Sequence, residues 1–134
     1  MSAGDLFESA REEVLRLHAF FVAWFRGDAA EFADCERAFA LDFRMVTPDG
    51  AAHERESVVK RLRAARGSVG ADFTIEIAEP RLVWRVGDAV LLEYVERQQR
   101  DEKASARRAT GLFTRAEAAP AGALWRHLQE TWIG

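Results

Sequence analysis

The sequence has few of the features that mark disulfide-bonded, membrane or nucleic-acid-binding proteins. Its one cysteine, Cys35, cannot form a disulfide within the chain, which fits a reducing compartment. No apolar run approaches the ~18 residues that a membrane span needs, and no charged-then-apolar leader precedes a small-residue cleavage site. The net charge of −3 gives no reason to expect a polyanionic partner. We therefore expect a cytoplasmic protein whose partners include neither a membrane nor a nucleic acid.

Sequence motifs for metal, phosphate and nucleophilic chemistry are also missing. The three histidines, His18, His53 and His127, are far apart, and no His-Glu-x-x-His or Cys-x-x-Cys spacing occurs. There is no glycine-rich phosphate loop, and no serine has the context of a catalytic nucleophile. We therefore expect no metal site and no cofactor. His18 directly follows Leu17, a predicted core residue, and is expected to be solvated or satisfied in packing.

Length and composition predict one domain, residues 1–134. Its 49% of hydrophobic and 31% of charged residues match a globular protein, and its length suffices for a core. Apolar residues at three- and four-residue spacing predict helices over residues 5–26, 29–40 and 54–66. Gly27 suits the end of the first helix, and Asp28 with Glu31 forms a capping box for the second. On that second helix Cys35 is expected to be an inert core residue.

Alternating apolar and polar residues predict the strands. These cover residues 43–47, 73–77, 81–86, 89–99, 105–114 and 123–133. Pro80 predicts a bend or bulge between the second and third, and Gly87-Asp88 predicts a turn. Helices gathered at one end of the chain and strands at the other predict an α+β domain, with three N-terminal helices packed on one face of a strongly bent antiparallel sheet.

Five short segments resemble a known superfamily in their order and spacing. They are Phe25-Arg26-Gly27-Asp28, Thr47-Pro48-Asp49-Gly50, Gly87-Asp88 before a strand with Tyr94, Ala109-Thr110-Gly111-Leu112-Phe113, and Trp125 opening the last strand. With these the chain resembles the nuclear transport factor 2-like superfamily, which includes ketosteroid isomerase, polyketide cyclase-like proteins and the association domain of calcium/calmodulin-dependent kinase. The resemblance implies a cone with an internal pocket and a symmetric dimer through the outer sheet face. It implies no single function, because this fold hosts enzymes and non-enzymes.

The residues that would carry ketosteroid isomerase chemistry are absent. The carboxylate base before a Pro-x-Gly turn corresponds to Thr47, and the tyrosine that binds the enolate corresponds to Phe20. The protonated aspartate corresponds to Gly111, or to Thr110 if the register shifts by one residue. Neither a threonine hydroxyl nor a phenyl ring can do this work near neutral pH, so that reaction is not expected.

Strand alternation predicts the pocket lining. If Tyr94 points inward, so does Glu96, and a short turn near residues 100–103 places Glu96 opposite Arg107. The resemblance adds that Trp125, superposed on the family's tryptophan, sends Glu130 inward and that His53 lies near the pocket mouth as a ligand contact. The predicted apolar lining is Phe20, Trp24, Met45, Leu92, Phe113, Leu128 and Trp132, and the polar lining is Thr47, Tyr94, Glu96, Arg107 and Glu130.

The candidate catalytic residues are Glu96, Glu130 and Arg107. Two glutamates that share a poorly solvated site with one arginine should have different pKa values, so that one of them serves as a general acid or base. The alternative is a cross-strand ion pair between Glu96 and Arg107 that only fixes the register. A one-residue error in register would instead bring Glu93 near Thr110 and Arg108.

Two functions remain open at this point. The first is a small-molecule-binding protein, or an enzyme of the cyclase, isomerase, dehydratase or hydrolase type. The alternative is a non-catalytic dimerisation or association module. In both, apolar residues expected on the outer sheet face (Trp84, Val95, Trp125 and Ile133) favour a homodimer through that face.

Overall fold

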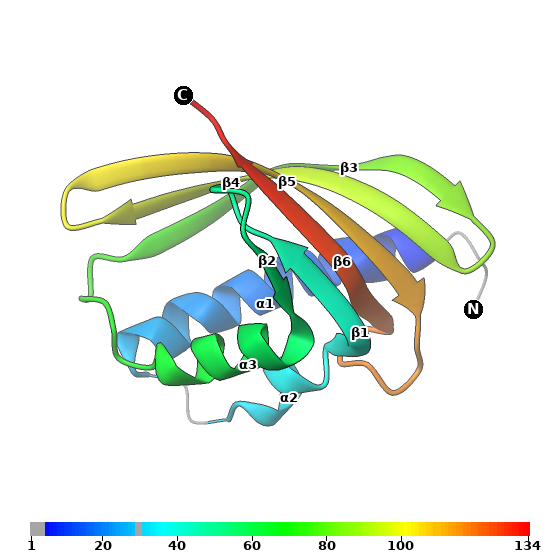
Figure 1. Ribbon diagram of the computed structural model, residues 1–134, viewed down its shortest axis with the longest axis horizontal. Helices are drawn as coiled ribbons and strands as arrows, with labels where there is room; N and C mark the ends of the chain where they lie inside the picture. Colours follow the sequence, from blue (N-terminus) through cyan, green and yellow to red (C-terminus); the bar gives the residue numbers. More distant parts are fainter. Residues whose placement is uncertain (1–4, 29–30) are drawn as a thin grey trace.

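The computed structural model describes residues 5–28 and 31–134 and shows three helical segments beside one sheet (Figure 1). The elements are α1 (Asp5–Arg26), α2 (Ala33–Glu36), β1 (Phe39–Val46), β2 (Ala52–Glu54), α3 (Arg55–Ala64), β3 (Thr74–Val86), β4 (Ala89–Arg100), β5 (Lys103–Arg115) and β6 (Ala123–Trp132). Figure 1 shows α1 and α3 on the same side of the sheet, with the opposite face uncovered by any helix. The predicted α+β class is confirmed.

The sheet has six strands in the order β2-β1-β6-β5-β4-β3. Successive hairpins make β3 to β6 antiparallel, as predicted, but β1 and β6 pair in parallel. The prediction of a purely antiparallel sheet was therefore wrong. These two strands are far apart in the sequence, so no hairpin constrains their relative direction.

The hairpin between β4 and β5 has the predicted position and register. Arg100 pairs with Lys103, which leaves Asp101 and Glu102 as a two-residue loop. Both loop residues have positive φ angles, 51° and 66°, as in the turns whose twist matches that of the flanking strands. The register therefore places Glu96 opposite Arg107, as predicted. The same register also places Glu93 opposite Thr110 and 3.6 Å from Arg108, so that proximity does not require a register error.

The second helix is much shorter than predicted. Residues 29–30 lie outside the described residues, and α2 covers only one turn, Ala33–Glu36. The expected cap does not form, because the residue before the helix is Phe32, with no side-chain hydrogen bond to the helix. Phe39 belongs instead to β1, where it pairs with Trp125 on β6. Strand pairing and core burial thus outweigh the local helix signal.

Pro80 produces the predicted irregularity without ending the strand. The pairing of β3 with β4 shifts between Ala78 and Arg81, and again between Leu82 and Trp84. The two predicted strands around Pro80 are therefore one long, bent strand. Among the described residues, no helix combines the length and hydrophobicity of a transmembrane segment.

Candidate functional site

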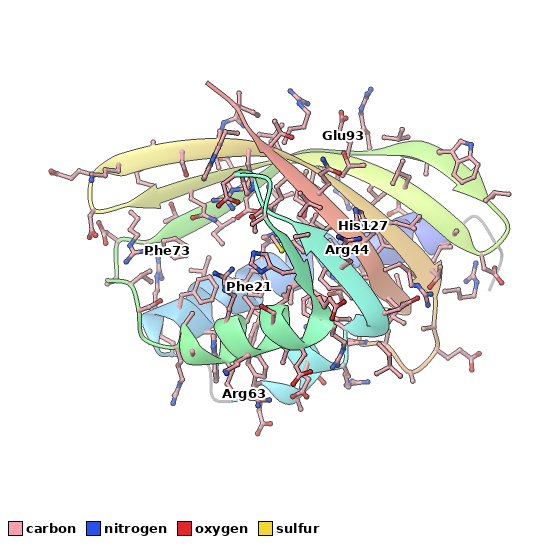
Figure 2. All side chains as sticks on the ribbon, viewed as in Figure 1. Phe21, Arg44, Arg63, Phe73, Glu93 and His127 are labelled. Atoms are coloured by element: carbon pink, nitrogen blue, oxygen red, sulfur yellow. The ribbon has the colours of Figure 1, made fainter. Side chains whose placement is uncertain are left out.

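A cavity of about 160 Å³ lies between the helices and the inner face of the sheet. Its wall is mainly apolar, and Figure 2 shows Phe21 of α1 between the helix and the sheet. The apolar lining is Leu17, Phe21, Phe25, Phe39, Phe43, Met45, Val58, Leu62, Ile75, Trp125 and Leu128; the polar lining is His18, Glu96, Gln98, Arg107 and Glu130. An apolar hollow with a few polar groups has the composition of a small-molecule site.

His18 and Glu96 form a buried ion pair at the polar side of this cavity. The Nε2 atom of His18 lies 3.1 Å from Oε1 of Glu96, and its Nδ1 lies 2.7 Å from the backbone oxygen of Val14. The carbonyl oxygen only accepts, so Nδ1 carries a proton. A neutral ring would then turn a bare Nε2 towards a carboxylate oxygen. The geometry therefore favours the imidazolium, with a second proton on Nε2.

The pKa values follow this arrangement. Burial alone would lower the pKa of His18, but the charge and hydrogen bond of Glu96, together with the hydrogen bond to Val14 and the charge of Glu130, raise it above 6.5. Burial alone would raise the pKa of Glu96, but His18 and a hydrogen bond from Gln98 bring it down to about 2. Gln98 donates from Nε2 to Oε2 of Glu96 over 2.6 Å. Both oxygens of Glu96 are thus occupied, and the group stays ionised.

Glu130 is held much more loosely. Its Oε1 accepts one hydrogen bond from Nη1 of Arg107, at 3.2 Å. Burial, and next the charge of Glu96, raise the pKa of Glu130, while Arg107 opposes them. The two carboxyl groups therefore differ: His18, which was outside the predicted set, keeps Glu96 a fixed anion, and Glu130 is the group that can change its protonation state.

Among the described residues, two buried donors near Glu130 have no hydrogen-bond partner. They are the hydroxyl of Tyr94 and the Nε of Arg107. Tyr94 is 1% exposed, and burial, followed by the charges of Glu96 and Glu130, raises the pKa of its hydroxyl well above 10. The hydroxyl therefore keeps its proton. Buried donors are normally paired, so both groups are notable: Arg107 lines the cavity, and Tyr94 belongs to the core.

A second polar contact supports the apolar wall. Trp125 donates from Nε1 to Oε2 of Glu13 over 2.9 Å, and Arg16 donates two hydrogen bonds to the same carboxylate. Burial raises the pKa of Glu13, against the effect of Arg16. Cys35 is buried, which raises the pKa of its thiol to about 12 and leaves it unreactive, as expected.

Five predicted residues line the cavity: Met45, Glu96, Arg107, Leu128 and Glu130. The predicted pairing of β4 with β5 explains two of them, Glu96 and Arg107. Glu93, the alternative to Glu96, points away from the helices (Figure 2) and forms ion pairs with Arg81 and Arg108.

Phe20 and Trp24 do not line the cavity, because α1 turns a neighbouring part of its apolar surface inward. The two rings stack, 5.6 Å apart, and both contact Phe32. Trp24 also donates to the backbone oxygen of Leu62. Phe21 and Phe25 occupy the cavity wall in their place.

The other predicted lining residues lie around the cavity. Leu92, Tyr94 and Phe113 point inward but are buried in the core. Thr47 bonds to Asp49 and Ala51 at the exposed end of β1. His53 on β2 contacts Arg61. Neither Thr47 nor His53 lines the cavity.

Trp132 lies outside the cavity, and Trp125 departs from its predicted strand face. Trp132 is half exposed, and its ring centroid lies 4.7 Å from the guanidinium carbon of Arg107. Trp125, expected on the outer face, is buried on the inner one. A register shift between Leu112 and Phe113 explains this, because it lets Trp125 and Leu128 both point inward.

The sequence interpretation missed His18 and Gln98. His18 stands four residues after Val14 and three before Phe21, which places it within the apolar stripe of α1. A polar residue in such a stripe needs a buried partner, and this is the signal that could have identified it. In the part of the chain that the structure describes, no three histidine, cysteine, aspartate or glutamate residues cluster as metal ligands.

Comparison with known proteins places the chain by its structure. No family model and no curated protein sequence matches it. A solved NTF2-like protein of unknown function from Pseudomonas aeruginosa matches with a TM-score of 0.84 and 30% identity, covering 94% of this chain and 99% of that one. The calcium/calmodulin-dependent kinase II hub of S. rosetta matches with a TM-score of 0.70 and 15% identity, over 91% and 95% of the two chains. The second match shows the fold alone. The first spans nearly all of both chains at 30% identity, and the protein therefore belongs to the nuclear transport factor 2-like (NTF2-like) family.

Proposed function

We propose that this protein binds a small, largely apolar molecule in its cavity and exchanges a proton with it through Glu130. The observation that carries the proposal is the asymmetry of the cavity: an apolar, aromatic wall faces one group of four charged side chains, His18, Glu96, Arg107 and Glu130. The wall would hold the body of the ligand, and the charged group would bind its polar atom. Proton transfer of this kind serves cyclases, isomerases, dehydratases and hydrolases alike.

Within this proposal the charged residues have unequal roles. Arg107 binds an oxygen of the ligand, and Glu130 gives or takes a proton. Glu96 is a positioning residue, since His18 and Gln98 occupy both its oxygens. The alternative function, a non-catalytic association module, is not favoured: the likeness to the kinase hub, at 15% identity, concerns the fold.

The binding function can be tested by filling the cavity with a larger side chain. Leu128→Trp should abolish the binding of small apolar fragments, detected by ligand-observed NMR, because the indole would take up the space that Leu128 borders. Thr131→Trp is the matched control, since Thr131 lies on the same strand with its side chain exposed. It should bind fragments like the wild-type protein.

Folding of each variant is checked by circular dichroism. If Leu128→Trp does not fold, Met45→Trp fills the cavity from β1 instead. Unchanged binding in a folded cavity-filling variant, or no fragment binding by the wild-type protein, would contradict the proposal.

The outer face of the sheet suits a second copy of this chain. Trp84 and Val86 are 56% and 54% exposed on β3, and Ile133 is 40% exposed after β6. A homodimer through this face would remove apolar surface from water. Sedimentation should give twice the mass of one chain, and Trp84→Asp should give a folded monomer. A wild-type monomer at high concentration would contradict the homodimer.

A further inference from the structure

Arg107 has more hydrogen-bonding capacity than the protein uses. Its side chain is 16% exposed, and a guanidinium carries five N–H groups. Among the described residues it makes one side-chain hydrogen bond, from Nη1 to Glu130, and its Nε is buried without an acceptor. The ring of Trp132 covers the guanidinium at 4.7 Å but supplies no oxygen. A planar guanidinium with unused donors is suited to a carboxylate.

The partner of Arg107 is also the carboxylate that is easiest to displace. Its one hydrogen bond, at 3.2 Å, is longer than the usual charge-assisted bond of about 2.7–2.9 Å. The charged or titratable groups that act on Glu130 come from three elements: His18 from α1, Tyr94 and Glu96 from β4, and Arg107 from β5. Glu96 cannot leave its place in the same way, because two donors hold it.

We propose that the cavity takes a small monocarboxylic acid, whose carboxylate replaces Glu130 on Arg107 while Glu130 becomes protonated. This inference rests on the proposed ligand-binding function. The charges balance: before and after the exchange the site holds two cations, His18 and Arg107, and two anions. A ligand that arrives as the carboxylate brings one proton from solvent onto Glu130, and one that arrives as the neutral acid transfers its own proton.

The cavity limits the size of the acid. Its volume of about 160 Å³ is close to that of an engineered cavity of about 150 Å³ that binds benzene. Aromatic rings from Phe21, Phe25, Phe39, Phe43 and Trp125 form much of its wall. A benzene-sized body with one carboxylate therefore fits both the apolar and the polar part, which makes benzoate the appropriate probe and benzamide its neutral counterpart.

Isothermal titration calorimetry of the full chain tests the exchange. At about pH 6 benzoate should bind about tenfold more tightly than benzamide, since only the anion can replace Glu130 on the guanidinium. At about pH 8, buffers of different ionisation enthalpy should reveal up to about one proton taken up per benzoate, and the affinity should fall as the pH rises.

Two variants assign the proton and the anion site. Glu130→Gln should bind benzoate at about pH 8 at least as tightly as the wild-type protein, with the proton uptake lost. The double variant Arg107→Gln/Glu130→Gln removes both charges of the pair, so that neither residue is left charged without its partner. It should bind benzoate about tenfold more weakly than the wild-type protein and bind benzamide with unchanged affinity.

The outcomes separate this inference from the function on which it rests. Benzamide binding as tightly as benzoate would overturn the carboxylate inference and leave the cavity as a ligand site. Proton uptake unchanged in Glu130→Gln would place the proton on His18 and overturn the exchange. Failure of benzoate, benzamide and all neutral fragments to bind would overturn both proposals.

Discussion

His18→Leu should lower the free energy of unfolding by about 3–5 kcal/mol, the usual result of breaking one side of a buried ion pair. Glu96 is 4% exposed and His18 is 5% exposed, so water cannot replace the lost partner. Without His18, burial raises the pKa of Glu96 with much less opposition, so the carboxyl group must either stay charged without its partner or take up a proton, and both cost stability. Urea unfolding near neutral pH measures the effect as a lower midpoint at unchanged slope.

The double variant His18→Leu/Glu96→Leu is the control for this loss. Removing both charges leaves neither member of this pair as an unpaired buried ion, so most of the lost stability should return. A single variant as stable as the wild-type protein would show that the pair contributes nothing. A double variant no more stable than the single would show that the loss comes from packing around His18.

The ion pair between His18 and Glu96 should also affect how the stability of the protein depends on pH. The pKa of His18 is raised, so its contribution to the free energy of unfolding is complete below pH 6.5. That contribution is lost as the pH rises through the pKa of His18 in the folded state. The pKa of Glu96 is lowered, so its contribution is complete above 4.5 and is lost as the pH falls towards about 2. The pair should therefore contribute most between pH 4.5 and 6.5. The raised pKa of Glu130 also removes stability as the pH rises, so the alkaline decline should be reduced, not abolished, in His18→Leu.

The polar part of the site could be predicted where local geometry fixes the register. Alternation along β4 sends Tyr94 and Glu96 to the same side, and a two-residue turn leaves one pairing, with Arg107 opposite Glu96. These signals lie within consecutive residues and need no knowledge of the rest of the fold. For that reason the sequence predicted Glu96 and Arg107, whereas the prediction of Glu130 depended on the family resemblance.

The rest of the site depends on contacts between distant segments. Four consecutive or nearly consecutive aromatic residues of α1, Phe20, Phe21, Trp24 and Phe25, leave the cavity-facing side of the helix ambiguous. Only the packing of α1 against α3 and the sheet selects Phe21 and Phe25. The shift in the pairing of β5 with β6, which turns Trp125 inward, likewise has no local proline or glycine signal in β6. Tertiary contacts decide the orientation of a helix and the position of a bulge. The composition of the chain and the spacing of its apolar residues do not specify these contacts.

Trp125→Ala should be the other strongly destabilising change, by about 5 kcal/mol. Truncating a buried tryptophan typically costs about 3–5 kcal/mol, and the loss of the indole donor leaves the carboxylate of Glu13 short of a hydrogen bond, which adds about 1–3 kcal/mol. The ring is 1% exposed and lies 4.4 Å from the ring of Phe113, so neighbouring side chains have little room to refill the space.

Two comparison variants separate the contributions to this loss. Trp125→Ala/Glu13→Gln should be less destabilised than the sum of its single changes if the hydrogen bond between the two side chains matters, because the uncompensated carboxylate is then gone. Leu41→Ala, on β1 with its side chain 91% exposed, should change the free energy of unfolding by no more than about 0.5 kcal/mol. A loss at Trp125 as small as that at Leu41 would mean that the inward turn of Trp125 does not hold in solution. The cavity wall and the bulge in β6 would then have to be placed differently.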